Sequence, residues 1–177
     1  MTLPQSRFYI LAGPPGAGKT TLLEALSTSV TVVPEYARRV LAQERETGGR
    51  ATGDQDPALF VQRMLETALS DYEMASGLTV FDRGLPDLLA FCAHYDISDE
   101  QVRREVAARR YQRTVFFLPA WEAIYRTDDE RVLNFAGAKA FGALIRTAYE
   151  QSGYHIVEVP KTSVGDRAAF IRERIER

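Results

Sequence analysis

A glycine-rich segment near the N-terminus constrains the fold of this chain more than any other feature. It runs from Gly13 to Thr20 with the sequence GPPGAGKT, directly after the apolar run 8–12 and directly before a segment with helical periodicity. The order therefore predicts a strand, a loop and a helix. Glycines let the backbone curl so that successive N–H groups point at a phosphate, and the helix N-terminus adds partial positive charge. This spacing is that of a phosphate-binding P-loop.

The motif assigns a role to each of its residues. We expect Lys19 to reach the β- and γ-phosphates of ATP and the Thr20 hydroxyl to hold Mg²⁺. A glycine-rich turn that merely caps a helix is the alternative, and the apolar run before the loop disfavours it. The residues predicted to bind ATP are Gly13, Pro14, Pro15, Gly16, Ala17, Gly18, Lys19, Thr20 and Thr21.

Short β-branched or aromatic runs alternate with longer helical segments along the rest of the chain. This alternation predicts an α/β fold, in which helices cover both faces of a parallel sheet. No linker divides residues 1–177, so we expect one domain. The expected strands are Arg7–Ala12, Thr31–Pro34, Leu78–Phe81, Thr114–Leu118 and His155–Val159. The expected helices are Lys19–Ser27, Tyr36–Thr47, Pro57–Ser76, Pro86–Ala93, Asp99–Tyr111, Trp121–Tyr125, Glu130–Ser152 and Val164–Glu176.

Composition argues against several classes of protein. The 177 residues suffice for a core, and a net charge of −2 gives no general attraction to nucleic acid or to anionic membranes. The N-terminal residues do not resemble a signal peptide and no long apolar run is present, so we expect a cytoplasmic protein. The single cysteine, Cys92, precludes an internal disulfide, and two histidines are too few for a credible zinc site. Nothing in the composition indicates the oligomeric state.

An acidic residue follows the third predicted strand. Asp82 stands at the carboxyl end of that strand, where open α/β sheets bind their ligands, and can hold Mg²⁺ directly or through water. Capping of the next helix is the alternative role for Asp82. The following residue is Arg83, where a motor-type ATPase needs a second acid to activate water. An arginine at this position favours the clamping of a phosphoryl group or a substrate.

Taken together, these residues resemble the P-loop kinase branch that contains thymidylate, deoxynucleoside and nicotinamide-riboside kinases. More closely, the chain is similar to small bacterial ATPases of the AAA-domain type. The resemblance implies a five-stranded parallel sheet in the order 2-3-1-4-5, with a kinase-like lid after the fourth strand. It is carried by the glycine loop and by residues 33–39 (VPEYARR), 82–87 (DRGLPD) and 125–131 (YRTDDER).

The resemblance also indicates an acceptor-binding residue. In the similar nucleoside kinases an acid after the second strand contacts the hydroxyl that accepts the phosphoryl group, and Glu35 occupies that place. A carboxylate there can take the hydroxyl proton and align the oxygen with the γ-phosphate. A solvated glutamate at a helix N-terminus is the alternative. Of the two arginines one turn later, we prefer Arg38 to Arg39 as a substrate ligand because its three-residue spacing keeps it beside Glu35.

The lids of these kinases carry two arginines several residues apart, and Arg126 and Arg131 match this pattern here. Arginine can stack on adenine and can neutralise charge on the transferring phosphoryl group. Pairing with the neighbouring acids of a solvated turn is the alternative for both. The arginine-rich segment 103–113 is open to two interpretations, a solvated helix face or a contact with an anionic acceptor.

The sequence thus predicts an ATP- and Mg²⁺-dependent phosphotransferase acting on a small nucleoside, nucleotide or related metabolite. Its predicted catalytic residues are Lys19, Glu35, Asp82, Arg83, Arg126 and Arg131, and its predicted substrate ligands are Glu35, Arg38 and Arg83. A nucleotide-binding regulator or slow ATPase that phosphorylates no acceptor is the alternative. A GTPase is disfavoured, because the fourth strand ends in Leu118-Pro119-Ala120-Trp121 and not in a guanine-reading Asn-Lys-x-Asp motif.

Overall fold

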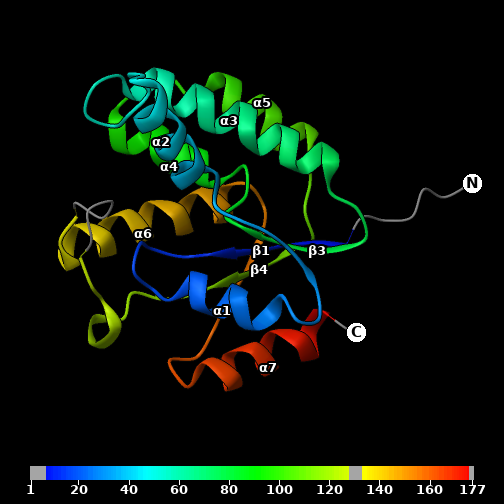
Figure 1. The fold of residues 1–177 in the computed structure, drawn as a ribbon. Coiled ribbons are helices and arrows are strands. Elements are labelled where there is room, and N and C mark those ends of the chain that lie inside the picture. The colour runs from blue at the N-terminus through cyan, green and yellow to red at the C-terminus, as the bar shows by residue number, and fades with distance from the viewer. Residues whose placement is uncertain (1–6, 128–132, 176–177) are drawn as a thin grey trace, which may run out of the picture.

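The computed structural model describes residues 7–127 and 133–175 of the chain. A five-stranded sheet with the order β2-β3-β1-β4-β5 lies at the centre of the molecule (Figure 1), and every neighbouring pair is parallel. The predicted strand order is therefore confirmed. The strands are β1 (Arg7–Ala12), β2 (Thr31–Val33), β3 (Leu78–Asp82), β4 (Thr114–Phe117) and β5 (His155–Glu158).

Helices cover both faces of this sheet. Figure 1 shows α1 and α7 side by side on one face and α2 to α6 gathered on the other. None of the helices in the described ranges has the length and apolar character needed to cross a bilayer. The helices are α1 (Lys19–Leu26), α2 (Tyr36–Thr47), α3 (Pro57–Met74), α4 (Asp87–Tyr95), α5 (Glu100–Ala108), the 3₁₀ helix η1 (Glu122–Ile124), α6 (Phe135–Gln151) and α7 (Val164–Ile175).

The central strand explains how one apolar run serves both layers. Successive side chains of a strand point to opposite faces. Phe8 and Ile10 on β1 pack into the core beneath α2 to α6, whereas Leu11 packs into the core shared with α1 and α7. Both sides of β1 are therefore buried, which is why its sequence reads as continuously apolar and not as alternating.

The structure differs from the predicted helices mainly at their ends. The helix expected from Glu130 begins at Phe135, because the Asn134 side chain accepts a hydrogen bond from the Gly137 backbone N–H and caps it there. Residues 130–132 of that prediction lie outside the described part of the chain. The helix expected to reach Tyr111 ends at Ala108, where Arg109 turns extended and leads into β4.

Two further segments can be compared with the prediction. The helix expected over 121–125 is only the short 3₁₀ turn η1. The arginines of α5 pair with acids of their own helix, Arg103 with Asp99 and Arg104 with Glu100, in exposed ion pairs. This favours the interpretation of 103–113 as a solvated face.

Parallel strands bring the predicted site residues to one edge of the sheet. The glycine loop follows β1, Glu35 follows β2, Asp82 ends β3, and the segment 118–121 follows β4. Because the carboxyl ends of all the strands lie at this edge, the fold gathers the four segments around the start of α1, where open α/β sheets bind ligands.

Candidate active site

The glycine loop is held in a conformation that its glycines make possible. Gly16 and Gly18 adopt left-handed φ values of 77° and 88°. Gly13 lies so close to the end of β4 that a Cβ atom on it would stand 2.4 Å from the Leu118 carbonyl oxygen. A side chain at Gly13 would therefore push the loop away from the sheet.

Lys19 folds back onto this loop. Its Nζ donates hydrogen bonds to the carbonyl oxygens of Gly13 at 3.2 Å and of Pro14 at 3.0 Å, and the residue is buried. Burial and the nearby charge of Arg83 lower the pKa of Lys19 to about 8, while the carboxylates of Asp82 and Glu35 act in the opposite direction. Lys19 thus shares one electrostatic environment with the acids and the arginine that follow β2 and β3.

Asp82 is the last residue of β3 and pairs in register with Leu11 of β1. The residue is 5% exposed, and its Oδ1 atom has no hydrogen-bond partner among the described residues. Burial, with a smaller contribution from the charge of Glu35, raises the pKa of Asp82 to about 6, although Lys19 and Arg83 oppose the rise. Asp82 therefore caps no helix, and a buried carboxylate oxygen without a partner needs a proton or a cation.

These residues fit a magnesium ion bound with a nucleotide. Mg²⁺ in phosphate-transfer sites usually takes one or two protein oxygens and completes its shell with water and phosphate oxygens. Asp82 offers such an oxygen, and Thr20, at the exposed second position of α1, offers a hydroxyl. Among the described residues, no group of three or more acids, histidines or cysteines could hold a metal ion.

Arg83 is enclosed by carboxylates. Its Nε donates to Glu35 Oε1 at 2.8 Å and its Nη1 donates to Asp87 Oδ1 at 2.9 Å, and its side chain is 2% exposed. Although burial alone would lower it, these two carboxylates raise the pKa of Arg83. The backbone of Arg83 is in the left-handed region at φ 68°, which is uncommon for a residue other than glycine. Such conformations concentrate at functional sites.

Glu35 lies at the N-terminus of α2 and joins two arginines. It accepts from Arg83 and forms an ion pair with Arg38 at 3.5 Å. Burial alone would raise the pKa of Glu35, but the charges of Arg83 and Lys19 outweigh burial and lower it. Glu35 is therefore a carboxylate at neutral pH that can accept hydrogen bonds, and it is a weaker base than an isolated glutamate.

The two arginines one turn after Glu35, Arg38 and Arg39, contact different groups. Arg38 is the member of the pair whose guanidinium meets the Glu35 carboxylate, whereas Arg39 Nε donates to the Glu35 backbone carbonyl at 3.4 Å. Arg39 instead reaches away, donating to both carboxylate oxygens of Asp71 on α3 and to the Pro34 carbonyl. Arg39 therefore ties α2 to α3 and does not enter the candidate site.

Buried tyrosines hold the segment after β3, and sequence reasoning missed them. Tyr149 donates to Asp87 Oδ2 and accepts from the Gly84 N–H at 3.1 Å. Tyr36 donates to the Gly84 carbonyl at 3.2 Å, and Tyr111 accepts from the Leu85 N–H at 3.3 Å. Tyr36 lies in the 33–39 motif and Asp87 in the 82–87 motif, but no local pattern indicates that the tyrosines reach this segment, because each is far from it in sequence.

Of the two predicted lid arginines, the structure describes Arg126 alone. Arg126 donates to the carbonyl oxygens of Ala123 and Tyr125, within its own turn. Arg131 lies outside the described residues.

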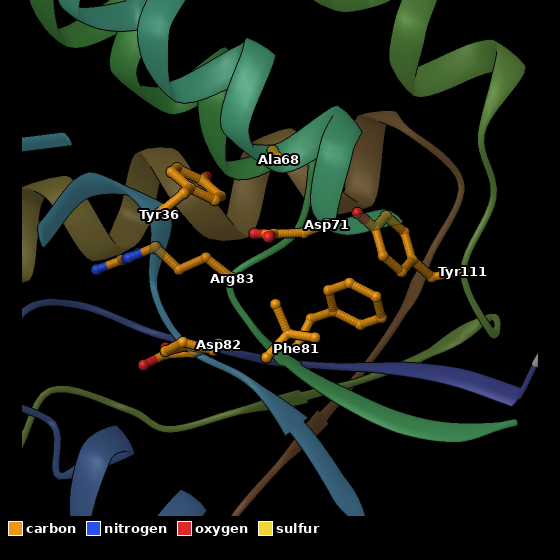
Figure 2. A pocket seen from close by; sticks show the side chains of 9 residues that line it. Tyr36, Ala68, Asp71, Phe81, Asp82, Arg83 and Tyr111 are labelled. Atoms are coloured by element: carbon orange, nitrogen blue, oxygen red, sulfur yellow. The ribbon is translucent and has the colours of Figure 1, made fainter. Parts of the chain in front are cut away.

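Two hollows flank the site. Figure 2 shows the narrower one, between the end of β3 and helices α2 and α3, with Asp82 and Arg83 extending to the same side and away from Tyr111. The side chains leave no room there for a water molecule. A wider hollow of about 590 Å³ lies between the glycine loop, the end of β4 and α6, and its basic residues are Lys139, Arg146 and Lys161.

Comparisons with solved structures place this fold among kinases. A deoxyadenosine kinase from M. mycoides superposes with a TM-score of 0.66 at 13% identity, covering 96% of this chain and 98% of that one. A NadR protein in complex with NR gives 0.73 at 16%, covering 97% of this chain and 52% of that one. Shikimate kinase from Acinetobacter baumannii gives 0.63 at 16%, covering 97% and 94%. At such identities the likeness shows a shared fold.

A comparison with protein families gives a match over most of the chain. No curated protein matches the sequence. A family model described as "AAA domain" matches residues 8–167, which includes the glycine loop, Glu35, Asp82 and Arg83. The chain therefore belongs to this AAA-domain family and has the P-loop kinase fold.

Proposed function

We propose that this protein is a phosphotransferase that moves the γ-phosphoryl group of ATP to a hydroxyl of a small acceptor, with Mg²⁺ as the metal. One observation carries the proposal: the lysine of the glycine loop shares a buried site with Asp82, whose carboxylate oxygen is unpartnered among the described residues, and with the pair of Arg83 and Glu35. A phosphate-binding loop, a metal ligand and an acceptor ligand are the parts that phosphoryl transfer requires.

Each residue has a distinct task in this proposal. The loop amides and Lys19 bind the β- and γ-phosphates. To do so, Lys19 gives up its hydrogen bonds to the loop carbonyls and donates to phosphate oxygens instead. Thr20 and Asp82 would hold Mg²⁺, which when bound neutralises phosphate charge. Arg83 and the predicted lid arginines Arg126 and Arg131 stabilise charge on the transferring group.

Glu35 binds the acceptor hydroxyl in this proposal. The lowered pKa of Glu35 keeps it ionised, so it can accept a hydrogen bond from the hydroxyl and orient the oxygen toward the γ-phosphate. Arg83 fixes the carboxylate at 2.8 Å and is itself fixed by Asp87. Arg38, which borders Glu35 and is 45% exposed, is placed to contact other polar groups of the acceptor.

One observation favours the alternative of a nucleotide-binding regulator or slow ATPase. The hollow between β3, α2 and α3 is too narrow for water, and Glu35 already pairs with Arg83 and Arg38. For a kinase, the acceptor must then approach Glu35 from the open side of the site. A regulator needs no such approach.

The two functions differ in their response to an acceptor. The full chain is screened by thermal shift with ATP and Mg²⁺ against nucleosides, nucleotides and other hydroxylated metabolites, because a ligand of the native state raises Tm. ADP formation is then measured with and without each compound that binds. A kinase shows acceptor-stimulated turnover and a phosphorylated product, both absent in Lys19→Ala. Slow turnover that no compound stimulates supports the regulator.

A further inference from the structure

Arg167, in the first turn of α7, is a buried cation without a counterion in the described part of the chain. The residue is 5% exposed, and its Nε and Nη1 atoms have no hydrogen-bond partner within the described ranges. Burial lowers the pKa of its guanidinium. The other strongly buried cations of the site are satisfied, Lys19 by loop carbonyls and Arg83 by two carboxylates. A buried unpaired charge is costly and is normally paired, so Arg167 indicates a missing anion.

The surroundings of Arg167 locate that anion at the nucleotide-binding loop. A Cβ atom on Gly18 would stand 3.0 Å from Arg167 Nη1 and 3.2 Å from Ile124 Cδ1. The indole ring of Trp121 lies against the guanidinium, with its centroid 5.5 Å from Cζ. Arg167 therefore lies where the last glycine of the loop meets the segment that follows β4.

The order of the strands decides which end of a nucleotide reaches Arg167. Asp82 and Glu35 follow β3 and β2, on one side of β1, and in the proposed function they bind the metal and the acceptor near the γ-phosphate. Trp121 and Arg167 follow β4 and β5, on the other side of β1. A triphosphate lying across the loop then directs its nucleoside end toward Trp121, and the anionic group at that end is the α-phosphate.

We propose that Arg167 binds the α-phosphate of the nucleotide, with Trp121 packed beside the same guanidinium. The inference rests on the nucleotide site of the proposed function and adds a ligand that the glycine motif does not contain. It also predicts a trade-off. Without nucleotide the buried charge destabilises the fold, and with nucleotide it is paired with phosphate oxygens.

The test compares Arg167→Met, which keeps much of the side-chain volume and removes the charge, with Arg174→Met on the same helix. Arg174 is exposed, and its described contacts stay within its own helix: it donates to the Phe170 carbonyl, pairs with Glu173 and lies over the Phe170 ring, so it is a matched control. Trp121 is the only tryptophan of the chain, and its fluorescence reports binding beside Arg167 directly. The full-length proteins are titrated with ADP and with UDP, and the Tm of each is measured with and without ADP.

We expect Arg167→Met to weaken ADP and UDP binding by the same factor, on the order of 10- to 100-fold, the usual loss for a charge-assisted hydrogen bond. Its Tm without nucleotide should rise, while the increase in Tm that ADP produces should shrink. Arg174→Met should bind both nucleotides within about twofold of wild type, as expected for an exposed side chain away from the site.

Several results would overturn the inference. Unchanged affinity in Arg167→Met, with a lower Tm, would make Arg167 a purely structural residue. A loss confined to ADP would place the contact on the base and not on the phosphate. If the wild-type protein bound neither nucleotide, the nucleotide site itself would fail, and the proposed function with it. Normal nucleotide binding by wild type and variant alike would refute the Arg167 contact alone.

Discussion

Replacing Asp82 by asparagine should stabilise the protein in the absence of metal, although it removes a proposed functional group. The pKa of Asp82 rises from an ordinary 3.8 to about 6 because the carboxylate is buried. Since the folded pKa lies above the unfolded one, the ionised carboxylate destabilises the native state above about pH 6. The penalty declines as the pH falls and is lost below about 3.8.

The size of this effect follows from the shift. A difference of about two pKa units corresponds to about 3 kcal/mol at 1.36 kcal/mol per unit. This shift already includes the favourable charges of Lys19 and Arg83, so it reflects the net cost of ionising Asp82 in the fold. We therefore expect Asp82→Asn to raise the free energy of unfolding by about 1–3 kcal/mol at pH 7.5 and by less than about 1 kcal/mol at pH 4.

Urea unfolding in EDTA at the two pH values measures this difference. A variant less stable than wild type at pH 7.5, or one whose advantage persists unchanged at pH 4, contradicts the account of a buried carboxylate without a partner.

The same variant tests the metal site. It should bind ATP like wild type in EDTA and lack the extra affinity that Mg²⁺ gives wild type. An unchanged effect of Mg²⁺ would remove Asp82 from the metal site.

Other substitutions test the remaining parts of the site. Lys19→Ala should fold, lose detectable turnover and bind ATP at least about tenfold more weakly, and wild-type-like turnover would refute the assignment of the loop. Glu35→Gln should keep ATP affinity within about twofold and lose about 10²–10⁴ in acceptor-stimulated rate, so an intact stimulated rate would exclude Glu35. Tyr149→Phe should lower the free energy of unfolding by about 1–3 kcal/mol in urea, because it removes the hydroxyl that donates to the buried Asp87 carboxylate, while the Gly84 N–H keeps its bond to Asp87 Oδ2. Tyr9→Phe, whose hydroxyl makes no hydrogen bond to the described residues, is the control and should change it by less than about 0.5 kcal/mol.

The strands and the gathering of the site at one sheet edge could be predicted because they depend on local signals, whereas the strand order was implied by the resemblance to P-loop kinases. The glycine loop is recognised by the spacing of its residues, and Asp82 by its position after an apolar run. The partners of Arg83 could not be predicted, because an arginine after a strand can face solvent, a phosphate or a carboxylate. Only the folded packing shows that Glu35 and Asp87 both reach it.

Helix ends and buried side chains also depend on packing that local sequence signals do not show. Asn134 caps α6 several residues after the apparent start of its pattern, since a polar residue can cap, turn or remain solvated. Arg167 occurs in an amphipathic segment in which arginine is the usual solvated residue. Its burial beside Gly18 depends on α7 packing against α1, which joins residues nearly 150 positions apart in the sequence and which periodicity does not reveal.

The tyrosines around Gly84 and Leu85 link the chemistry to the layer of helices above it. Tyr36 comes from α2, Tyr149 from α6, and Tyr111 from the segment before β4, yet all converge on the turn that carries Arg83. The position of Arg83 therefore depends on the packing of several helices at once. If the protein is the proposed kinase, substitutions that shift α2 or α6, even on their outer surfaces, should alter turnover before they alter nucleotide affinity. A change of acceptor could then arise through helix packing while the glycine loop stays unchanged.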